Sequence, residues 1–281
     1  MTSDFAVRPM RPGELELALE WARQEGWNPG VDDSHGFHAA DPEGFLVGAL
    51  GEVPIGSISL VKYGADFAFL GLYLVHPEFR GRGFGKALWD AAIAAAGTRT
   101  IGLDGVPAQQ DNYRRKGFEI AYRTQRYGGV PLQPPVATLV AQPVTEKIDG
   151  LVRYDASIFT VARPDFLTAW CETRRGRRTY IVRKSGKIKG YGTIRRCFDG
   201  YKIGPVFAAD AEIARALFAA LLPEAAGARI FIDVPADNGP AVELCQSLGL
   251  QPVFETARMY RGPAPAIPLR NVFGVTTLEL G

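Results

Sequence analysis

An apolar run at residues 67–75 passes directly into a glycine-rich segment and then into a helical pattern. This junction restricts the fold more than any other part of the chain. The run reads FAFLGLYLV, which is typical of a buried strand. The segment that follows, FRGRGFGKAL, contains Gly81, Gly83 and Gly85 together with two arginines. From about Gly83 the pattern predicts a helix that ends near Gly97, because glycine commonly follows the last helical turn.

The start of this helix has the properties of an anion-binding site. Its first N–H groups lack intrahelical partners and lie at the positive end of the helix dipole. The glycines let a bulky anion approach these amides, and Arg80, Arg82 and Lys86 add positive charge. Two common phosphate-binding loops are excluded, because Lys86 breaks the pattern GxGxxG and Ala87 stands where a P-loop requires Ser or Thr. We therefore predict a phosphate cradle of another kind; the alternative is a turn that only tightens strand-to-helix packing.

Composition narrows the class of protein. A chain of 281 residues is long enough for about two domains, and 47% hydrophobic with 22% charged residues describes a globular protein. A formal net charge of +2 argues against nucleic acid and membrane surfaces as partners. Three scattered cysteines without a CxxC pair indicate a reducing compartment and neither a disulfide framework nor a metal site. With no signal peptide or membrane-spanning run recognised, we expect a cytoplasmic protein.

A proline-rich stretch, YGGVPLQPPVATLVAQP at residues 127–143, predicts the boundary between two domains. We place an N-terminal domain at residues 1–130 and a C-terminal domain at residues 136–281. The apolar patterns of the first half predict the order strand, two helices, three strands, helix, strand, helix, strand. That order indicates an α/β or α+β sheet domain.

The stretch VHPEFRGRGFGKAL resembles the acetyl-CoA-binding motif of the GCN5-related N-acetyltransferases (GNAT). That motif reads Val-x-Pro-x-aromatic-Arg/Gln-Gly-x-Gly-x-Gly/Ala, then two residues and Leu. The matching positions are Val75, Pro77, Phe79, Arg80, Gly81, Gly83, Gly85 and Leu88. The resemblance covers about residues 4–129, and the predicted order of elements agrees with that fold. It implies that acetyl-CoA is bound through Leu74 and Val75 at the strand end, beside a bulge that splays the strand from its neighbour. It also implies that Arg80, Gly81, Arg82, Gly83, Phe84, Gly85 and Lys86 hold the pyrophosphate.

Acetyl transfer also needs an acid and a base. Family members often carry a Tyr four residues before a Gly-Phe pair, and Tyr113 has this position, so the resemblance implies that Tyr113 protonates the departing thiolate. A neutral phenol can donate that proton. The Asn that often stands seven residues earlier is replaced by Val106, and the acid of the fourth strand is missing. We therefore expect Asp104, at a strand end, to accept the amine proton. Its alternative is a turn-forming role, and His76 is a weaker option.

In the family, the loop between the first two helices lines the acceptor site. Here it reads GWNPGVDDSHGFH, and we expect Trp27, Asn28, Asp32 and Phe37, together with Tyr73 on the strand, to bind the substrate. Aromatic rings beside carboxylates suit a small cationic amine. The alternative is a plain turn, because Asn-Pro-Gly is strong turn chemistry.

The second half repeats the first without its cradle. TYIVRKSGKIKGYGTIR parallels GFLVGALGEVPIGSISL, while Asp210 and Glu212 replace two cradle glycines and Cys245 replaces the tyrosine. Asp210 would cap the helix itself, and two carboxylates would repel a pyrophosphate. The whole chain thus resembles two tandem GNAT domains, the second degenerate. Each is expected to have a mixed, mostly antiparallel sheet flanked by helices and splayed between its fourth and fifth strands.

The expected activity is transfer of acetyl from acetyl-CoA to a primary amine of a small molecule, by direct attack and without a metal. A non-catalytic acyl-CoA-binding or sensing protein and a protein-lysine acetyltransferase are the alternatives. We expect a monomer with pseudo-dimeric domains, or a homodimer. The second domain is expected to close the open sheet edge of the first, with residues 270–280 or residues 136–143, and to form one wall of the acceptor cleft.

Overall fold

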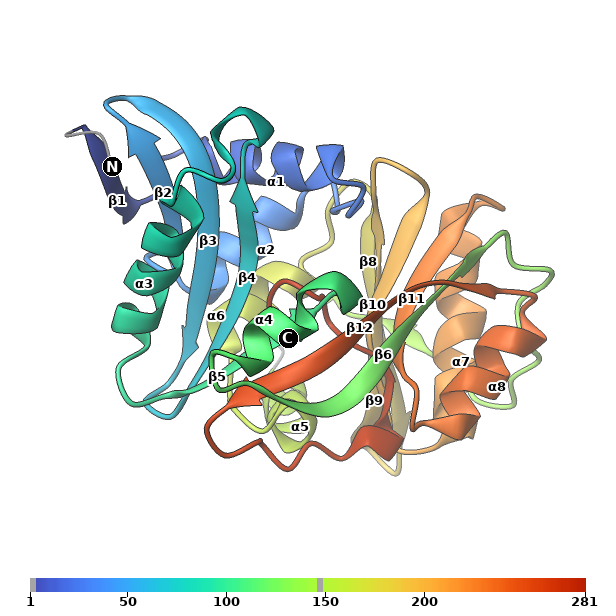
Figure 1. The fold of residues 1–281 in the computed structure, drawn as a ribbon. Coiled ribbons are helices and arrows are strands. Elements are labelled where there is room, and N and C mark those ends of the chain that lie inside the picture. The colour runs from blue at the N-terminus through green and yellow to red at the C-terminus, as the bar shows by residue number, and fades with distance from the viewer. Residues whose placement is uncertain (1–3, 146–148) are drawn as a thin grey trace.

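The computed structural model describes residues 4–145 and 149–281, and the strands of these residues join one sheet that runs through both halves (Figure 1). The elements of the first half are β1 (Phe5–Pro9), α1 (Glu14–Gln24), α2 (Asp33–Ala40), β2 (Phe45–Leu50), β3 (Val53–Tyr63), β4 (Phe67–Val75), the 3-10 helix η1 (Pro77–Phe79), α3 (Phe84–Ala96), β5 (Thr100–Gly105), α4 (Pro107–Arg114) and β6 (Glu119–Gly129).

The second half contains β7 (Gln142–Pro143), α5 (Asp149–Phe159), α6 (Pro164–Cys171), β8 (Arg177–Lys184), β9 (Lys187–Arg196), β10 (Tyr201–Ala208), α7 (Ala211–Leu221), η2 (Leu222–Ala225), β11 (Ile230–Pro235), α8 (Gly239–Ser247), β12 (Gln251–Arg261), η3 (Leu269–Asn271) and β13 (Val272–Gly274). The predicted order of the first half is confirmed. From α5 to β12 the second half repeats the order of α1 to β6, so the chain is a structural tandem.

The two halves exchange their last strands. The sheet order is β1-β2-β3-β4-β5-β12-β6-β11-β10-β9-β8-β7, so β12 of the second half lies between β5 and β6 of the first. Its register on β5 pairs Ala257 with Gly105 and Tyr260 with Gly102. Gly102 makes this register possible, because a Cβ there would lie 3.0 Å from the Tyr260 ring.

This exchange corrects the predicted closure of the first sheet. The strands that pair with β6, where the open edge was expected, are β12 and β11, and neither residues 136–143 nor residues 270–280 pair with β6. Gln142–Pro143 instead pairs with β8 at the far end of the sheet, and Val272–Gly274 pairs with β10. The prediction was wrong because both proposed segments are short apolar stretches that fit any open edge, whereas β12 has eleven residues to offer.

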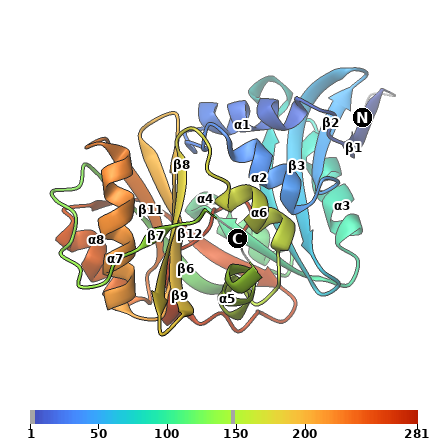
Figure 2. The same cartoon turned by 180° about the vertical axis from the view of Figure 1, so that it is seen from behind.

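Helices from both halves meet in the space between the two lobes of the sheet. Figure 2 shows α2 and α6 side by side there, and these two helices are in contact. One apolar core joins α1, α2 and β4 to α5, α6 and β9; Phe37, Phe69, Trp170 and Leu280 are among its buried members. A second core lies under α3, where Leu88, Trp89, Ala92 and Ala96 form one buried face. A third lies under α7 and α8.

A buried ionic cluster also joins the halves. The Asp33 carboxylate of α2 accepts a hydrogen bond from the Gly30 amide and pairs with Arg177 and Arg195 of the second half, at 3.2 and 3.0 Å. Burial alone would raise the pKa of Asp33, but Arg195 and Arg177 together lower it. Because removal of one partner would leave a buried charge, this cluster holds α2 firmly against β8 and β9.

Candidate active site

The predicted separation of β4 from β5 is confirmed. The two strands pair in parallel only as far as Leu70 and Leu103. The backbone then kinks at Leu72, which has a left-handed φ of 44°, and the register between β3 and β4 shifts at the same level. Over residues 71–75, β4 has no partner strand on the β5 side in the described part of the chain. Backbone groups of this stretch that point toward β5 are therefore available to a ligand.

The connection from β4 to α3 forms an open loop, which we call the cradle (residues 80–86). Gly81 and Gly83 have left-handed φ angles of 74° and 86°, and a Cβ at either position would meet nothing within 4 Å. Glycine is required by the backbone, and it leaves space above the first turn of α3. Phe84 begins α3 with a buried ring and without a side-chain cap, so the first N–H groups are left for another acceptor. Glycine is needed at position 85 for a different reason, because a Cβ there would lie 2.9 Å from the Tyr73 hydroxyl oxygen.

Three cations surround the cradle. Arg80 donates a hydrogen bond to the Val75 carbonyl and forms an ion pair with Glu25. The Arg82 guanidinium lies over the rings of Phe79 and Phe84. Lys86 forms an ion pair with Asp90. All three side chains are exposed, and exposed ion pairs contribute little to stability. They can therefore turn toward a phosphate at low cost.

The second half lacks both parts of this arrangement. Asp210 caps α7 itself, because its carboxylate accepts a hydrogen bond from the Ile213 amide at 2.9 Å. β10 and β11 also pair only at their first residues, but β13 then pairs with β10 at Val206 and Phe207. In the second half, β13 thus fills the gap between β10 and β11, whereas the corresponding gap between β4 and β5 stays open.

A cavity of about 920 Å³ lies where β4 and β5 separate. The first half contributes residues 25–28, residues 70–75, Arg80, the end of β5 and the α4 residues Gln109 and Tyr113. The second half contributes the opposite wall: Asp199, Phe231, Val253, Phe254, Thr256, Leu278 and Glu279. The expectation that the second half forms one wall of the cleft is therefore met by this cavity, which joins the edge of the cradle to side chains from both halves.

Tyr113 lines the cavity from α4, on the face toward α3. Its ring stacks on Trp89, with centroids 5.7 Å apart and an interplanar angle of 21°. Burial raises the pKa of Tyr113 to about 12, so the phenol keeps its proton at neutral pH. In the second half, the corresponding Cys245 is fully buried within α8. The second half therefore has no phenol at the position that corresponds to Tyr113.

Asp104 is placed in an ion pair with the exchanged strand. Both of its carboxylate oxygens accept hydrogen bonds from Arg258 of β12, at 3.0 and 2.8 Å. The exposed fractions of the two side chains are 3% for Arg258 and 0% for Asp104, so the carboxylate is shielded from solvent although Asp104 is among the residues that line the cavity. Burial alone would lower the pKa of Arg258, but Asp104 raises it well above its usual value. With both oxygens engaged, Asp104 is better suited to hold β5 to β12 than to accept a proton.

The residues expected to bind the acceptor divide into two groups. Trp27 and Asn28 do line the cavity, and their loop is tied to the second half. The Lys202 ammonium donates to the Trp27 carbonyl, and Asn28 exchanges two hydrogen bonds with the Asp199 backbone, at 2.9 Å each. Asn28 has a left-handed φ of 51°, which Asn tolerates better than most residues.

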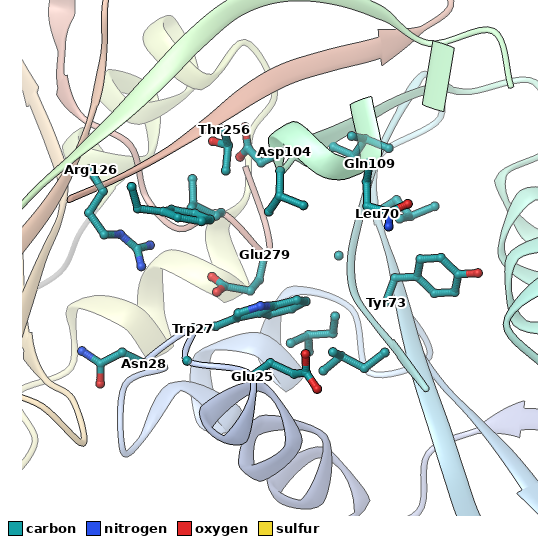
Figure 3. Close-up of a pocket in the computed structure, with 18 of the residues that line it drawn as sticks. Glu25, Trp27, Asn28, Leu70, Tyr73, Asp104, Gln109, Arg126, Thr256 and Glu279 are labelled. Carbon is teal, nitrogen blue, oxygen red and sulfur yellow. The ribbon is translucent and has the colours of Figure 1, made fainter. Parts of the chain in front are cut away.

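Asp32, Phe37 and Tyr73 do not lie as expected. Asp32 is outside the cavity and pairs with Arg174, while Phe37 is fully buried between the rings of α6 and β2. Tyr73 borders the cavity, but its side chain points away from Trp27 and toward α3 (Figure 3). The alternation of side chains along a strand explains this, because neighbours of Tyr73 on β4 face the opposite side. His76 packs against Trp21 and lies outside the cavity.

Sequence reasoning missed the cavity residues of the second half and Arg126 of β6. Figure 3 shows Arg126 and Glu279 on the side of the cavity that faces Trp27. Arg126 is held by Asp233 through two hydrogen bonds of 2.7 and 2.9 Å, which leave its remaining N–H groups for a ligand. One signal was present: Gly71 interrupts an apolar strand, and such a glycine often marks the close approach of another backbone.

The fold and this site define a tandem GCN5-related N-acetyltransferase, and the chain belongs to that superfamily. Models of the acetyltransferase (GNAT) family and of an acetyltransferase (GNAT) domain match residues 14–118 and residues 151–274, respectively. A holothin acyltransferase from a Pseudoalteromonas species is 33% identical over 279 residues, which cover 99% of this chain and 95% of the relative. The protein is therefore an acyltransferase with tandem GNAT domains.

Solved structures share this fold over the whole chain. A candidate acetyltransferase from Pyrococcus horikoshii has a TM-score of 0.83 at 23% identity, and the match covers 100% of this chain and 97% of the other. A tandem GNAT protein from the clavulanic acid biosynthesis pathway has a TM-score of 0.62 at 19% identity, over 93% of this chain and 100% of the other. At these identities the likeness shows the architecture alone.

Two features are absent from the described residues. Among residues 4–145 and 149–281, no group of three or more His, Cys, Asp or Glu side chains is arranged to hold a metal ion. In the same part of the chain, no helix is both long enough and apolar enough to cross a membrane.

Proposed function

We propose that the protein transfers an acyl group, with acetyl as the simplest case, from acyl-CoA to the amine of a small molecule. One observation carries the proposal. A single cavity brings the edge of the cradle, the unpaired backbone of β4 and the Tyr113 phenol together with a wall from the second half. Those parts correspond to a site for the pyrophosphate, a site for the pantetheine arm, a proton donor and a site for the acceptor.

The fit to coenzyme A rests on the cradle and on β4. The space above Gly81 and Gly83 would be lost with any side chain there, and the uncapped amides of α3 with Arg80, Arg82 and Lys86 suit a pyrophosphate. The edge of β4 over residues 71–75, which has no partner strand on the β5 side, suits an extended pantetheine arm. Bound there, acyl-CoA supplies an activated thioester carbonyl. One such site per chain is expected, because Asp210 and β13 occupy the equivalent places in the second half.

The acceptor side favours a small amine that carries a ring or another planar group. Trp27, Phe231 and Phe254 line this side of the cavity and offer apolar faces to it. Arg126 and Glu279 add opposite charges beside the rings. The wall formed by β12 and the chain end limits the space, which favours a small molecule over the lysine of a folded protein. Because one relative is named for holothin, holothin is the first compound to test as acceptor.

Tyr113 supplies the proton that the reaction needs at sulfur. The amine nitrogen attacks the thioester carbon, a C–N bond forms and the C–S bond breaks. The departing thiolate takes the phenolic proton of Tyr113, which is held in its neutral form by burial. The non-catalytic alternative, an acyl-CoA sensor, would need no such donor. The exchange of β6 and β12 within one chain also supports a monomer with pseudo-dimeric halves.

The test combines binding with turnover. Calorimetry with coenzyme A should give one site per chain, and Gly83→Asp should abolish binding, because a carboxylate would occupy the space above α3. Release of free thiol from acetyl-CoA should depend on an amine drawn from a panel that begins with holothin. Two equivalent coenzyme sites would contradict the assignment of the cradle. Binding of acetyl-CoA without amine-dependent release across the panel would favour the sensor.

A further inference from the structure

The chain end crosses back from the second half into the cavity of the first. After β13, residues 276–281 leave β10 and run to β4, and Leu278 and Glu279 line the cavity. This tail is held firmly. The Glu279 and Leu280 amides both donate to the Thr277 hydroxyl, and the Leu280 carbonyl accepts a hydrogen bond from Tyr63 at 3.0 Å. Leu280 itself is fully buried.

The tail meets β4 at the residue where the strands separate. A Cβ on Gly71 would lie 2.3 Å from the Glu279 carbonyl oxygen, so the contact requires glycine at this position. Pairing between β4 and β5 ends one residue earlier, at Leu70. Glu279 therefore enters the cavity beside the start of the unpaired stretch of β4, where the acyl end of a bound pantetheine would lie.

Glu279 differs from the other carboxylates of the cavity. Three of them pair with an arginine: Glu25 with Arg80, Asp104 with Arg258 and Asp199 with Arg229. The Glu279 carboxylate has no hydrogen bond or ion pair within residues 4–145 and 149–281, although the residue is only 6% exposed. Figure 3 shows it pointing into the cavity, between Trp27 and Arg126. A nearly buried carboxylate without a direct partner lowers the stability of the folded protein unless a bound ligand supplies a hydrogen bond or an opposite charge.

Charges on four strands act on this carboxylate from beyond contact distance. They are Arg126 on β6, Lys202 on β10, Arg195 on β9 and Asp104 on β5. The three cations are engaged elsewhere: Arg126 by Asp233, Arg195 by Asp33 and Lys202 by the Trp27 carbonyl. They place positive charge near the Glu279 carboxylate without contacting it.

We propose that Glu279 is a catalytic residue that receives the acceptor amine and takes its ammonium proton. This role rests on the proposed acyl transfer. The ammonium proton passes to the Glu279 carboxylate and then to solvent, which leaves a neutral nitrogen to attack the thioester carbon. The C–S bond breaks and sulfur takes the Tyr113 proton. The second proton that nitrogen loses as the amide forms restores the phenol through solvent, so one proton is released per turnover.

The experiment compares Glu279→Gln with Glu255→Gln, a matched change on the exposed face of β12 outside the cavity. Benzylamine, an ammonium ion at neutral pH, and aniline, already neutral there, serve as acceptors with acetyl-CoA. At pH 7, Glu279→Gln should lower kcat with benzylamine about 10²-fold or more, while aniline should lose only a few-fold. Raising the pH should shrink the benzylamine defect, because solvent then supplies the free amine. Affinity for coenzyme A should not change.

Each outcome decides one question. If the wild type and Glu279→Gln release thiol at the same rate with benzylamine, the proposed role of Glu279 is wrong. The proposed acyl transfer is not contradicted by that result. Equal loss with both amines at every pH contradicts proton acceptance and indicates a structural role. A wild-type protein that releases no thiol with these or any other amine contradicts the proposed function, and the role of Glu279 with it. Thermal melting of both variants checks that they are folded.

Discussion

Removing the Asp104 carboxylate should destabilise the protein strongly, and removing Arg258 at the same time should reverse most of the loss. In Asp104→Leu, the Arg258 guanidinium would stay 3% exposed without its two hydrogen bonds. Breaking a buried pair in this way costs about 3–5 kcal/mol. At about 2–4 °C per kcal/mol for a chain of this size, the melting temperature should fall by about 6–20 °C.

The double variant Asp104→Leu with Arg258→Met replaces the pair by apolar groups of similar length. Its stability should return to within about 1–2 kcal/mol of the wild type, or exceed it. Urea unfolding followed by tryptophan fluorescence measures both changes, and the two single variants complete the cycle. A loss below about 1 kcal/mol in Asp104→Leu would refute the reasoning.

The same double variant separates the two roles considered for Asp104. If this residue anchors β5 to β12, a stable double variant should keep amine-dependent thiol release within several-fold of the wild type. If it accepted the amine proton, release should fall about 10²-fold although the protein is folded. The second result would also remove the reason for assigning that proton to Glu279.

Three further outcomes are expected. Tyr113→Phe should leave acetyl-CoA affinity unchanged and lower kcat about 10²-fold or more, and an unchanged kcat with rate-limiting chemistry would contradict its role. Because its pKa is raised to about 12, the wild-type rate should show no decline from Tyr113 ionisation below about pH 11. Burial raises the pKa values of Cys171, Cys197 and Cys245 to about 12, 11 and 12, so a disulfide reagent should modify none of them before unfolding. Labelling of any one in the native protein would contradict this packing.

Features that depend on neighbours in sequence were predictable. The left-handed glycines at Gly81 and Gly83, the uncapped start of α3 and the acidic cap at Asp210 follow from residues a few positions apart. The order of elements was predictable for the same reason, because helix and strand periodicity are local patterns. Trp27 and Asn28 were placed in the cavity by their position in the loop between the first two helices.

Features that depend on pairing between the two halves could not be predicted from the sequence. The sequence of β12 has the pattern of an ordinary final strand, and that pattern fits β5 as well as β11, because both halves repeat the same order. The Arg258 partner of Asp104 was invisible for this reason. Phe37 was assigned to the substrate because a loop aromatic beside carboxylates looks the same whether it faces a cavity or the core. Glu279 belongs to a short, largely apolar segment, and the sequence does not show that its backbone meets Gly71 and that its carboxylate enters the cavity.

The exchange of β6 and β12 has a consequence for how the chain is made. When the first half has left the ribosome, β6 has been synthesised, but β11 and β12, its two neighbours in the final sheet, have not. The nascent first half therefore carries two unpaired strand edges, at β5 and at β6, and these can meet in a pairing that the finished protein lacks. Such a pairing must open before β12 can enter. Completion of the sheet thus waits until β12, which ends at Arg261, has been synthesised, and the first half cannot pair its last strands correctly before that point.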